Sequence, residues 1–468
     1  MKFISKTIKL LPFLFVVFAF NACSDDDDDT PPIVSDPDIV DIAASNAELT
    51  TLVTALELAE GDLDELLRDS GPFTVLAPTN QAFDNFLNGT AITDVPSDEL
   101  AQLLLNHVIS ADLTAADLSA ASSPYASTNA DGAGGENLSI YFDTSNGVRF
   151  NDVSSVIDGG ADIDASNGTI HIVDAVITLP NIVDHATAND GLTDLVGALT
   201  AGGNTAFTDL LSNEMMEFTV FAPDNDAFAA YTVDPNTVEN VLSNHVIVGA
   251  TAISTGLSSS YQETAATNAD DDALSLYIDV DSTDDVVLNG ISTVTTADIV
   301  ATNGVIHVVD EVIELPTVVT HAAANPAFST LVTALTDLTP NTDYVGILSA
   351  NDADNDDSPF TVFAPTNDAF GDLLTDLGLS SATEIDTATL NATLQLHVIT
   401  DSNVRAEDLA SLDGQSVGTF GGGNITIDAN TPAIIDPDGG SNPIIVTDVQ
   451  AVNGVVHAVS RVIRDLPE

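Results

Sequence analysis

Three stretches of the chain carry apolar residues at the spacing i, i+3, i+4 and i+7. This spacing places four apolar side chains on one helical face, so it predicts an amphipathic helix in each stretch. Capping residues support two helix starts: Ser45 with Glu48 has the form of a capping box, and Asn325 precedes Pro326 as an N-cap precedes a first-turn proline. The apolar residues are Leu49, Leu52, Val53 and Leu56; Leu192, Leu195, Val196 and Leu199; and Phe328, Leu331, Val332 and Leu335.

A strand pattern follows each of these helices. It reads Phe-Thr-Val-x-Ala-Pro and continues into Asn and an Ala-Phe pair, at residues 73–83, 218–228 and 360–370. The alternating Phe and Val side chains are typical of a strand that contributes to a core. The pattern therefore predicts a buried strand that leads into a helix. The expected N-caps of the three helices are Thr79, Asp224 and Thr366.

Two further signatures recur in the same order. His-Val-Ile begins at His107, His245 and His397, and Asn-Gly before a Val/Ile-rich run, which predicts a tight turn entering a strand, begins at residues 167, 303 and 453. The whole set returns with a period near 140 residues, about the size of a domain, so we expect three copies of one domain. Their ranges are 37–180, 181–316 and 317–468.

The first 23 residues have the layout of an export signal. Three lysines precede an apolar run from Leu10 to Phe20, which is too short to span a bilayer and predicts a removable signal. The segment ends at Cys23, the only cysteine of the chain, and this arrangement resembles the lipobox of bacterial lipoproteins, whose cysteine is lipidated. An incidental cysteine in an ordinary secretory signal is the alternative.

Residues 24–36 form an acidic segment with five consecutive aspartates and two prolines. Like charges repel and prolines are stiff, so this segment is expected to be an extended, disordered tether. A Cys-Ser-acidic run also resembles the surface-export signal of Bacteroidota lipoproteins, which implies an outer-membrane lipoprotein displayed on the cell surface and held by lipid at Cys23. A plain solvated spacer on a periplasmic lipoprotein is the alternative.

Charge excludes several kinds of partner. Residues 24–468 hold all 72 acidic residues of the chain but only five arginines and no lysine, which gives this stretch a formal charge of −67. Binding of nucleic acid and docking on anionic lipid through a basic patch both depend on Lys and Arg, so neither is expected. The acidity is typical of a solvated, self-repelling surface.

Asp352, Asp354 and Asp356 alternate as the first ligands of an EF-hand calcium loop do. The pattern then fails, because Asp357 stands at the glycine position and Phe363 at the position of the bidentate glutamate. The three aspartates are therefore metal-ligand candidates only. We expect no cofactor beyond weakly bound divalent cations.

All eight histidines occupy equivalent places in the repeats, which favours a structural role over catalysis. His185 and His321 open the second and third repeats, where Ile42 takes the equivalent place in the first. A histidine in apolar surroundings is more often a satisfied hydrogen-bonding residue than a base or a ligand. The chain also lacks Gly-x-Ser-x-Gly, His-Glu-x-x-His and a glycine-rich phosphate loop. Neither an enzyme nor a small-molecule substrate is expected.

The Phe-Thr-Val-x-Ala-Pro and Asn-Gly-x-x-His blocks together resemble the two signatures of the fasciclin (FAS1) domain. The resemblance covers residues 37 to 468 and implies an α+β fold, in which three tandem domains each have a β-sandwich or wedge with helices on one side. One departure concerns function: where the family has an adhesion-associated Tyr-His pair, this chain has Asn106, Asn244 or Leu396 before the histidine. The resemblance assigns structural roles to Phe73, Asn80, His107, His171, Phe218, Asn225, His245, His307, Phe360, Asn367, His397 and His457.

Two functions from different classes follow. The first is a lipid-anchored surface protein whose three fasciclin modules contact an unknown protein or matrix partner in adhesion, with weak contacts that sum to avidity. The second is a binder of anionic glycans or lipopolysaccharide that requires divalent cations to approach these polymers. Hydrolysis is a third hypothesis, which would require a turnover that is lost when His245 is replaced.

Overall fold

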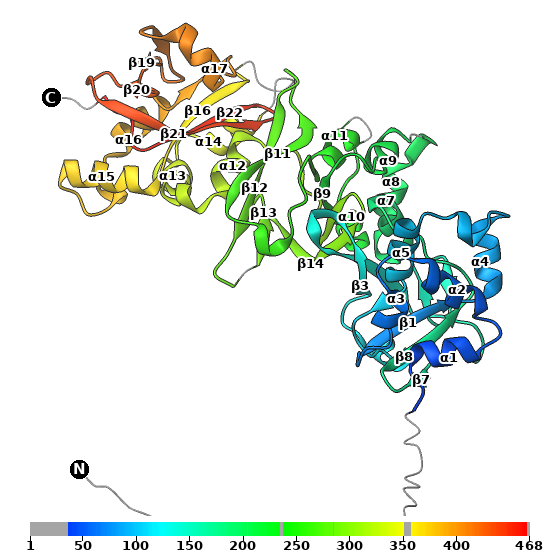
Figure 1. Ribbon diagram of the computed structural model, residues 1–468. Helices are drawn as coiled ribbons and strands as arrows, with labels where there is room; N and C mark the ends of the chain where they lie inside the picture. Colours follow the sequence, from blue (N-terminus) through cyan, green and yellow to red (C-terminus); the bar gives the residue numbers. More distant parts are fainter. Residues whose placement is uncertain (1–35, 204, 235–236, 284, 351–356, 466–468) are drawn as a thin grey trace, which may run out of the picture. The chain divides into compact units, whose positions relative to one another are not determined.

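The computed structural model describes residues 36–203, 205–234, 237–283, 285–350 and 357–465. The chain from Pro37 onward forms one unit, and three copies of one α+β domain follow each other within it (Figure 1). Cys23 and Asp352, Asp354 and Asp356 lie outside the described residues. Within the described ranges, every helix is too short or too polar to cross a membrane.

A parallel pair of strands, built from the two sequence signatures, lies at the centre of each domain. In the first domain β1 (Phe73–Pro78) pairs with β8 (Gly168–Val173) along its whole length, and every residue of both strands is buried. Strands buried on both faces are typical of a sheet that is covered on both sides. The equivalent, equally buried pairs are β9 (Phe218–Pro223) with β15 (Gly304–Val309) and β16 (Phe360–Pro365) with β22 (Gly454–Val459).

Two hydrophobic cores flank this strand pair in every domain. In the first domain Val75 packs with Leu56 and Phe83 in the core between sheet and helices. The next residue, Leu76, packs with Phe150 in a second core enclosed by the curled sheet itself. Successive side chains of a strand point to opposite faces, so the alternating pattern supplies both cores. The predicted α+β fold, with helices on one side of a β-wedge, is confirmed.

The sheets have the strand orders β6-β5-β4-β3-β2-β1-β8-β7, β10-β9-β15-β14-β13-β12-β11 and β17-β16-β22-β21-β20-β19-β18. The other elements of the first domain are α1 (Ile39–Ser45), α2 (Thr50–Leu58), α3 (Leu63–Leu66), α4 (Asn80–Leu87), α5 (Ser97–Leu105), α6 (Ala115–Ala120), β2 (Val108–Ile109), β3 (Tyr125–Asp131), β4 (Asn137–Asp143), β5 (Arg149–Phe150), β6 (Ser154–Ser155) and β7 (Ile163–Ala165). Those of the second are α7 (Ile182–Ala188), α8 (Thr193–Leu199), α9 (Ala206–Leu211), α10 (Asn225–Ala230), α11 (Val238–Ser243), β10 (Val246–Val248), β11 (Ser260–Thr267), β12 (Ala273–Val280), β13 (Val286–Leu288) and β14 (Ser292–Ala301). Those of the third are α12 (Val318–Ala324), α13 (Ser329–Thr333), α14 (Tyr344–Ser349), α15 (Asn367–Leu377), α16 (Thr387–Gln395), α17 (Ala406–Leu409), β17 (Val398–Ile399), β18 (Ser416–Gly418), β19 (Asn424–Asp428), β20 (Ala433–Ile435) and β21 (Ser441–Ala451).

The predicted helices form, but one predicted cap is wrong. Ser45 is the last residue of α1, so it does not form a capping box with Glu48 for α2, which has no side-chain cap from its own N-cap residue. A residue of another helix supplies the acceptor for the start of α2: Asn80 Oδ1, in α4, accepts a hydrogen bond from the Thr51 N–H at 2.8 Å. The predicted N-caps are confirmed at Thr79, Asp224, Thr366 and Asn325.

The asparagine of the Asn-Gly turn also holds the helices in place. Asn167 Oδ1 accepts from the Ile39 N–H at 3.0 Å, and its Nδ2 donates to the carbonyls of Leu67 and Asp69 at 2.8 Å each. A buried amide with three such bonds joins the first helix and the segment after α3 to the start of the central strand. The equivalent residues, with the same bonding pattern, are Asn303 and Asn453.

The glycine of this turn is required by both its conformation and its surroundings. Gly304 has a φ of +153°, and a Cβ at this position would lie 2.1 Å from the carbonyl oxygen of Phe218 on the neighbouring strand. The close parallel pairing of β9 and β15 therefore depends on the absence of a side chain. Gly168 and Gly454 have equivalent surroundings.

Replacing Gly304 with alanine should destabilise the second domain by about 3 kcal/mol, because the chain must relieve both the clash and the unfavourable φ. Gly197→Ala is the matched control in the same domain. Gly197 lies exposed in α8 with open space around its Cα, so alanine there should stabilise by about 0.5–1 kcal/mol. Calorimetry of the intact chain would measure both shifts, and shifts of the same sign would contradict the prediction.

Candidate functional site

The histidines of the His-Val-Ile signature are buried and bonded through both ring nitrogens. In the second domain the Nδ1–H of His245 donates to the carbonyl of Val241 at 2.8 Å, and its Nε2 accepts from the Ile313 N–H at 2.9 Å. These bonds fix one neutral tautomer, because a proton on Nε2 would face the Ile313 N–H. Each ring thereby joins a helix end to the segment after the last strand. His107 and His397 make the equivalent bonds.

The histidines of the Asn-Gly signature are held in the opposite tautomer. His307 Nε2 donates to the carbonyl of Ala252 at 2.9 Å, and its Nδ1 accepts from the Asp298 N–H at 3.3 Å. The ring stacks on Phe221 with a centroid separation of 5.5 Å. Both nitrogens are occupied, so the ring has no free lone pair for a metal or a substrate. His171 and His457 make equivalent bonds.

The histidines at the head of the second and third repeats are bonded through one nitrogen. His185 Nε2 donates to the carbonyl of Val300 at 3.2 Å, and His321 Nε2 to that of Gln450 at 3.0 Å. The Nδ1 atoms of both rings are buried and have no hydrogen-bond partner. Ile42, the first-repeat counterpart, is half-buried at the equivalent helical position.

These environments disfavour acid–base chemistry at the histidines. Burial outweighs the bonds to backbone carbonyls and lowers the pKa of five rings to about 4, those of His107, His185, His245, His321 and His397. A buried ring that remains neutral at physiological pH and already donates its proton to the backbone is a structural group. Within the described ranges, no three His, Cys, Asp or Glu side chains lie close enough together to bind a metal ion.

Equivalent apolar cavities of about 250 Å³ lie between helices and sheet in the second and third domains. Leu199 and Val220 line the first of them, and Leu335 and Val362 the second, whereas the corresponding space in the first domain measures only about 20 Å³. Such cavities can accept a small apolar group but supply no ionised group for catalysis.

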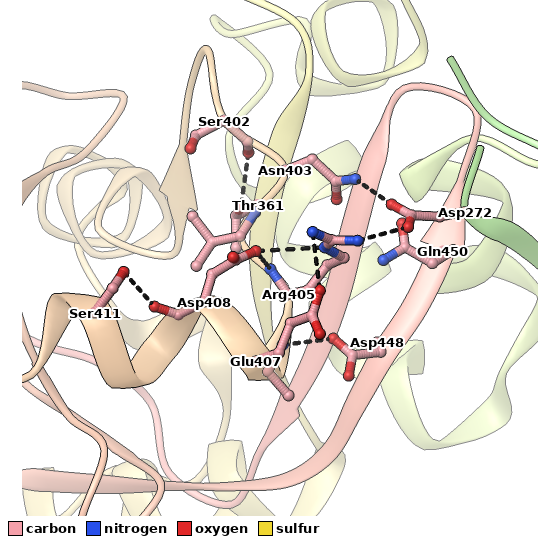
Figure 2. A network of polar contacts seen from close by, with 12 residues as sticks. Asp272, Thr361, Ser402, Asn403, Arg405, Glu407, Asp408, Ser411, Asp448 and Gln450 are labelled. Atoms are coloured by element: carbon pink, nitrogen blue, oxygen red, sulfur yellow. Dashed lines mark hydrogen bonds and ion pairs between the residues drawn. The ribbon is translucent and has the colours of Figure 1, made fainter. Parts of the chain in front are cut away.

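The described arginines are paired with carboxylates and do not form a basic patch. Arg405 is the most highly connected, with ion pairs to Asp272 at 2.8 Å, Glu407 at 2.9 Å and Asp408 at 3.3 Å (Figure 2). Asp272 lies in a run of three aspartates, residues 270–272, between β11 and β12. The composition could have indicated this ion pair. Residues 24–468 hold only five arginines among 72 acidic residues, so each arginine is expected to pair with carboxylates. The other arginine pairs are Arg68 with Asp38 and Asp41, Arg149 with Asp152, and Arg461 and Arg464 with Asp376.

Comparison with known proteins gives consistent matches along the chain. The family model described as Fasciclin domain matches residues 47–180, 190–316 and 326–465. Two proteins of Synechocystis sp., uncharacterized protein sll1735 and protein sll1483, are each 38% identical over 144 and 146 residues, which cover 31% and 30% of this chain and 98% and 73% of theirs. Human periostin is 26% identical over 416 residues, which cover 86% of this chain and 44% of periostin. A solved FAS1 domain pair from the insect cell adhesion molecule Fasciclin I is 20% identical with a TM-score of 0.37, over 57% of this chain and 96% of that chain.

The buried histidines predict a loss of stability in mild acid. In the unfolded chain five of them take up a proton near pH 6.5, whereas in the folded chain they do so only near pH 4. The unfolded state then binds more protons, so the free energy of unfolding falls as the pH falls through this window. The fall amounts to about 3 kcal/mol per histidine by pH 4.

His245→Gln should remove one of these contributions, because glutamine can donate and accept hydrogen bonds but does not titrate. We expect a lower free energy of unfolding at neutral pH and a weaker dependence on pH between 7 and 5, by up to about 1.4 kcal/mol per pH unit. Denaturant titration at high salt, which screens repulsion among carboxylates, would measure this dependence. A dependence equal to that of the unchanged chain would contradict the assignment.

Proposed function

Because the chain belongs to the fasciclin family, with three fasciclin domains in tandem, we propose that it is a non-catalytic protein that makes adhesive or protein contacts at the cell envelope. Fasciclin domains are found in cell-adhesion and extracellular proteins, and periostin and the protein ig-h3 are among the relatives of this chain. The threefold family match is the observation that carries the proposal.

The burial of the signature residues supports a binding role for the remaining surface. Phe73, Phe218 and Phe360 lie in the cores, and the eight histidines are at most 2% exposed. These groups hold the scaffold together and are inaccessible to a partner. Recognition therefore rests on exposed residues, which differ among the three domains, and weak contacts at several domains would add through their effective concentration.

The proposal includes a lipid anchor at Cys23, with residues 24–36 as the tether to the first domain. Its support is the sequence alone: a positively charged start, a short apolar run, one cysteine at its end and an acidic segment after it. A tether of this length reaches at most about 45 Å, which keeps the domains close to the membrane.

Cys23→Ser should release the protein from the membrane fraction, because serine cannot accept the thioether-linked lipid. Thr30→Ala, a neutral change within the tether, is the matched control and should leave the protein membrane-bound. Fractionation and protease treatment of intact cells would measure both. Retention of the serine variant in the membrane would contradict the anchor, and protection of the unchanged protein from protease would favour the periplasmic alternative.

Cells without the protein should attach less well to surfaces or matrix, and the unchanged gene should restore attachment. Crosslinking on intact cells with mass spectrometry would identify the proteins that contact each domain. Unchanged attachment together with an absence of crosslinked partners would contradict the binding role.

The strong negative charge favours one second candidate, a binder of anionic glycans or lipopolysaccharide that requires divalent cations. At a formal charge of −67 the surface repels such polymers unless cations bridge them. Calorimetry with lipopolysaccharide should then show heat of binding with calcium and none after chelation. Equal heats in the two conditions would remove this candidate.

A further inference from the structure

The contacts between successive domains are built twice from the same types of residue. At the first junction Tyr125, in the hairpin of β3 and β4, extends to the start of the second domain, where the Nδ2 of Asn189 donates to its hydroxyl at 3.2 Å. Its ring meets that of His185 edge-on at 5.8 Å. The second junction has the same hydrogen bond at 3.2 Å and a ring separation of 5.6 Å, from Tyr261, Asn325 and His321.

A backbone contact accompanies the aromatic one at both junctions. The Val300 N–H, in β14, donates to Ser139 Oγ of the first domain at 2.9 Å, and the Gln450 N–H, in β21, donates to Ser275 Oγ of the second at 3.0 Å. Val300 and Gln450 are buried, and each follows an irregular step in the pairing of its strand. The preceding domain thus supplies the hydrogen-bond acceptor for a buried backbone N–H of the next domain.

The outer faces of the first and third domains have different residues at the equivalent positions. In the third domain the hairpin of β18 and β19 contains no tyrosine and pairs Ser416 with Thr426, whereas the hairpins of the first and second domains each pair two tyrosines. In the first domain Ile42 replaces the histidine, and Asp164 stands exposed in the strand equivalent to β14. The tyrosine and histidine are therefore present where one domain meets the next, which explains why the first repeat has an isoleucine.

The two junctions differ in their polar contacts. At the second, Arg405 of the third domain pairs with Asp272 of the second at 2.8 Å, and Asn403 Nδ2 donates to the same carboxylate at 3.2 Å (Figure 2). At the first, Gly134 packs against Thr251, and a Cβ on this glycine would lie 3.0 Å from the threonine methyl. Only the second of these contacts is ionic. Without the guanidinium, Asp272 would face the carboxylates that also bind Arg405, those of Glu407 and Asp408.

We propose that the Tyr–His–Asn junction is a lock between successive domains, and that at the second junction Arg405 must neutralise facing carboxylates for the lock to close. The Arg405 side chain is 36% exposed, so salt screens its attraction to Asp272. High ionic strength therefore loosens the third domain from the second and leaves the first junction closed. The two junctions share their aromatic and backbone contacts, so the first serves as an internal reference for the second.

Amide hydrogen exchange of the intact chain tests this lock, because the Val300 and Gln450 N–H groups each report one junction. High salt should speed the exchange of Gln450 by about fivefold and leave Val300 unchanged. Arg405→Met should speed this exchange at low salt, and high salt should then slow it again, because salt screens the repulsion between Asp272 and the carboxylates of Glu407 and Asp408 that the guanidinium no longer neutralises. Arg68→Met, which breaks ion pairs within the first domain, is the matched control and should affect neither amide.

Tyrosine variants test the shared part of the lock. Tyr261→Ala should speed the exchange of Gln450 about tenfold and Tyr125→Ala that of Val300, each without effect at the other junction, and Tyr231→Ala should affect neither. Slow exchange in the central strands would show that the domains remain folded. If a tyrosine variant unfolds, Arg405→Met decides, because it changes a partly exposed side chain. Free exchange of both amides in the unchanged chain, or an equal response of both to salt, would overturn the proposal.

Discussion

The parallel pairing of two strands that lie far apart in the sequence of each domain is the constraint on which the rest of the structure depends. β1 and β8 are about a hundred residues apart in sequence, yet they run side by side with every residue buried. Their close approach requires Gly168, and the adjacent Asn167 joins the same point to the first helix and to the segment after α3. One core forms on each face of this strand pair, so the pair sets the positions of both the helices and the rest of the sheet.

Buried polar groups complete the scaffold because each has a defined partner. The six histidines of the two recurring signatures donate through one nitrogen and accept through the other, which joins segments that hydrophobic packing alone would leave free to slide. The same bonds make these residues unsuitable for catalysis or metal binding. In this protein the strongest sequence signals therefore identify the scaffold, and the residues available to a partner lie on the exposed and variable surface.

The strong negative charge of the chain limits the kinds of contact that can join one domain to the next. Surfaces that repel each other can be joined only by contacts that exclude water or neutralise charge. The first junction relies on close packing around Tyr125 and Gly134, whereas the second adds one of the chain's few arginines. The stability of the scaffold is thus largely a matter of burial, but the coupling between the second and third domains is also a matter of electrostatics.

The sequence by itself determined the family, the three α+β domains, their central strands and the helix caps at Thr79, Asp224 and Thr366, because these depend on periodicity and on bonds between near neighbours. The capping box predicted from Ser45 was wrong, because Ser45 is the last residue of α1 and does not begin the next helix. Tertiary structure alone decided that Asn80 bonds to α2 and that Tyr125 meets His185, since these partners lie 29 or more residues apart. A side chain's type limits the bonds it can make, but only the folded chain brings a distant partner within reach.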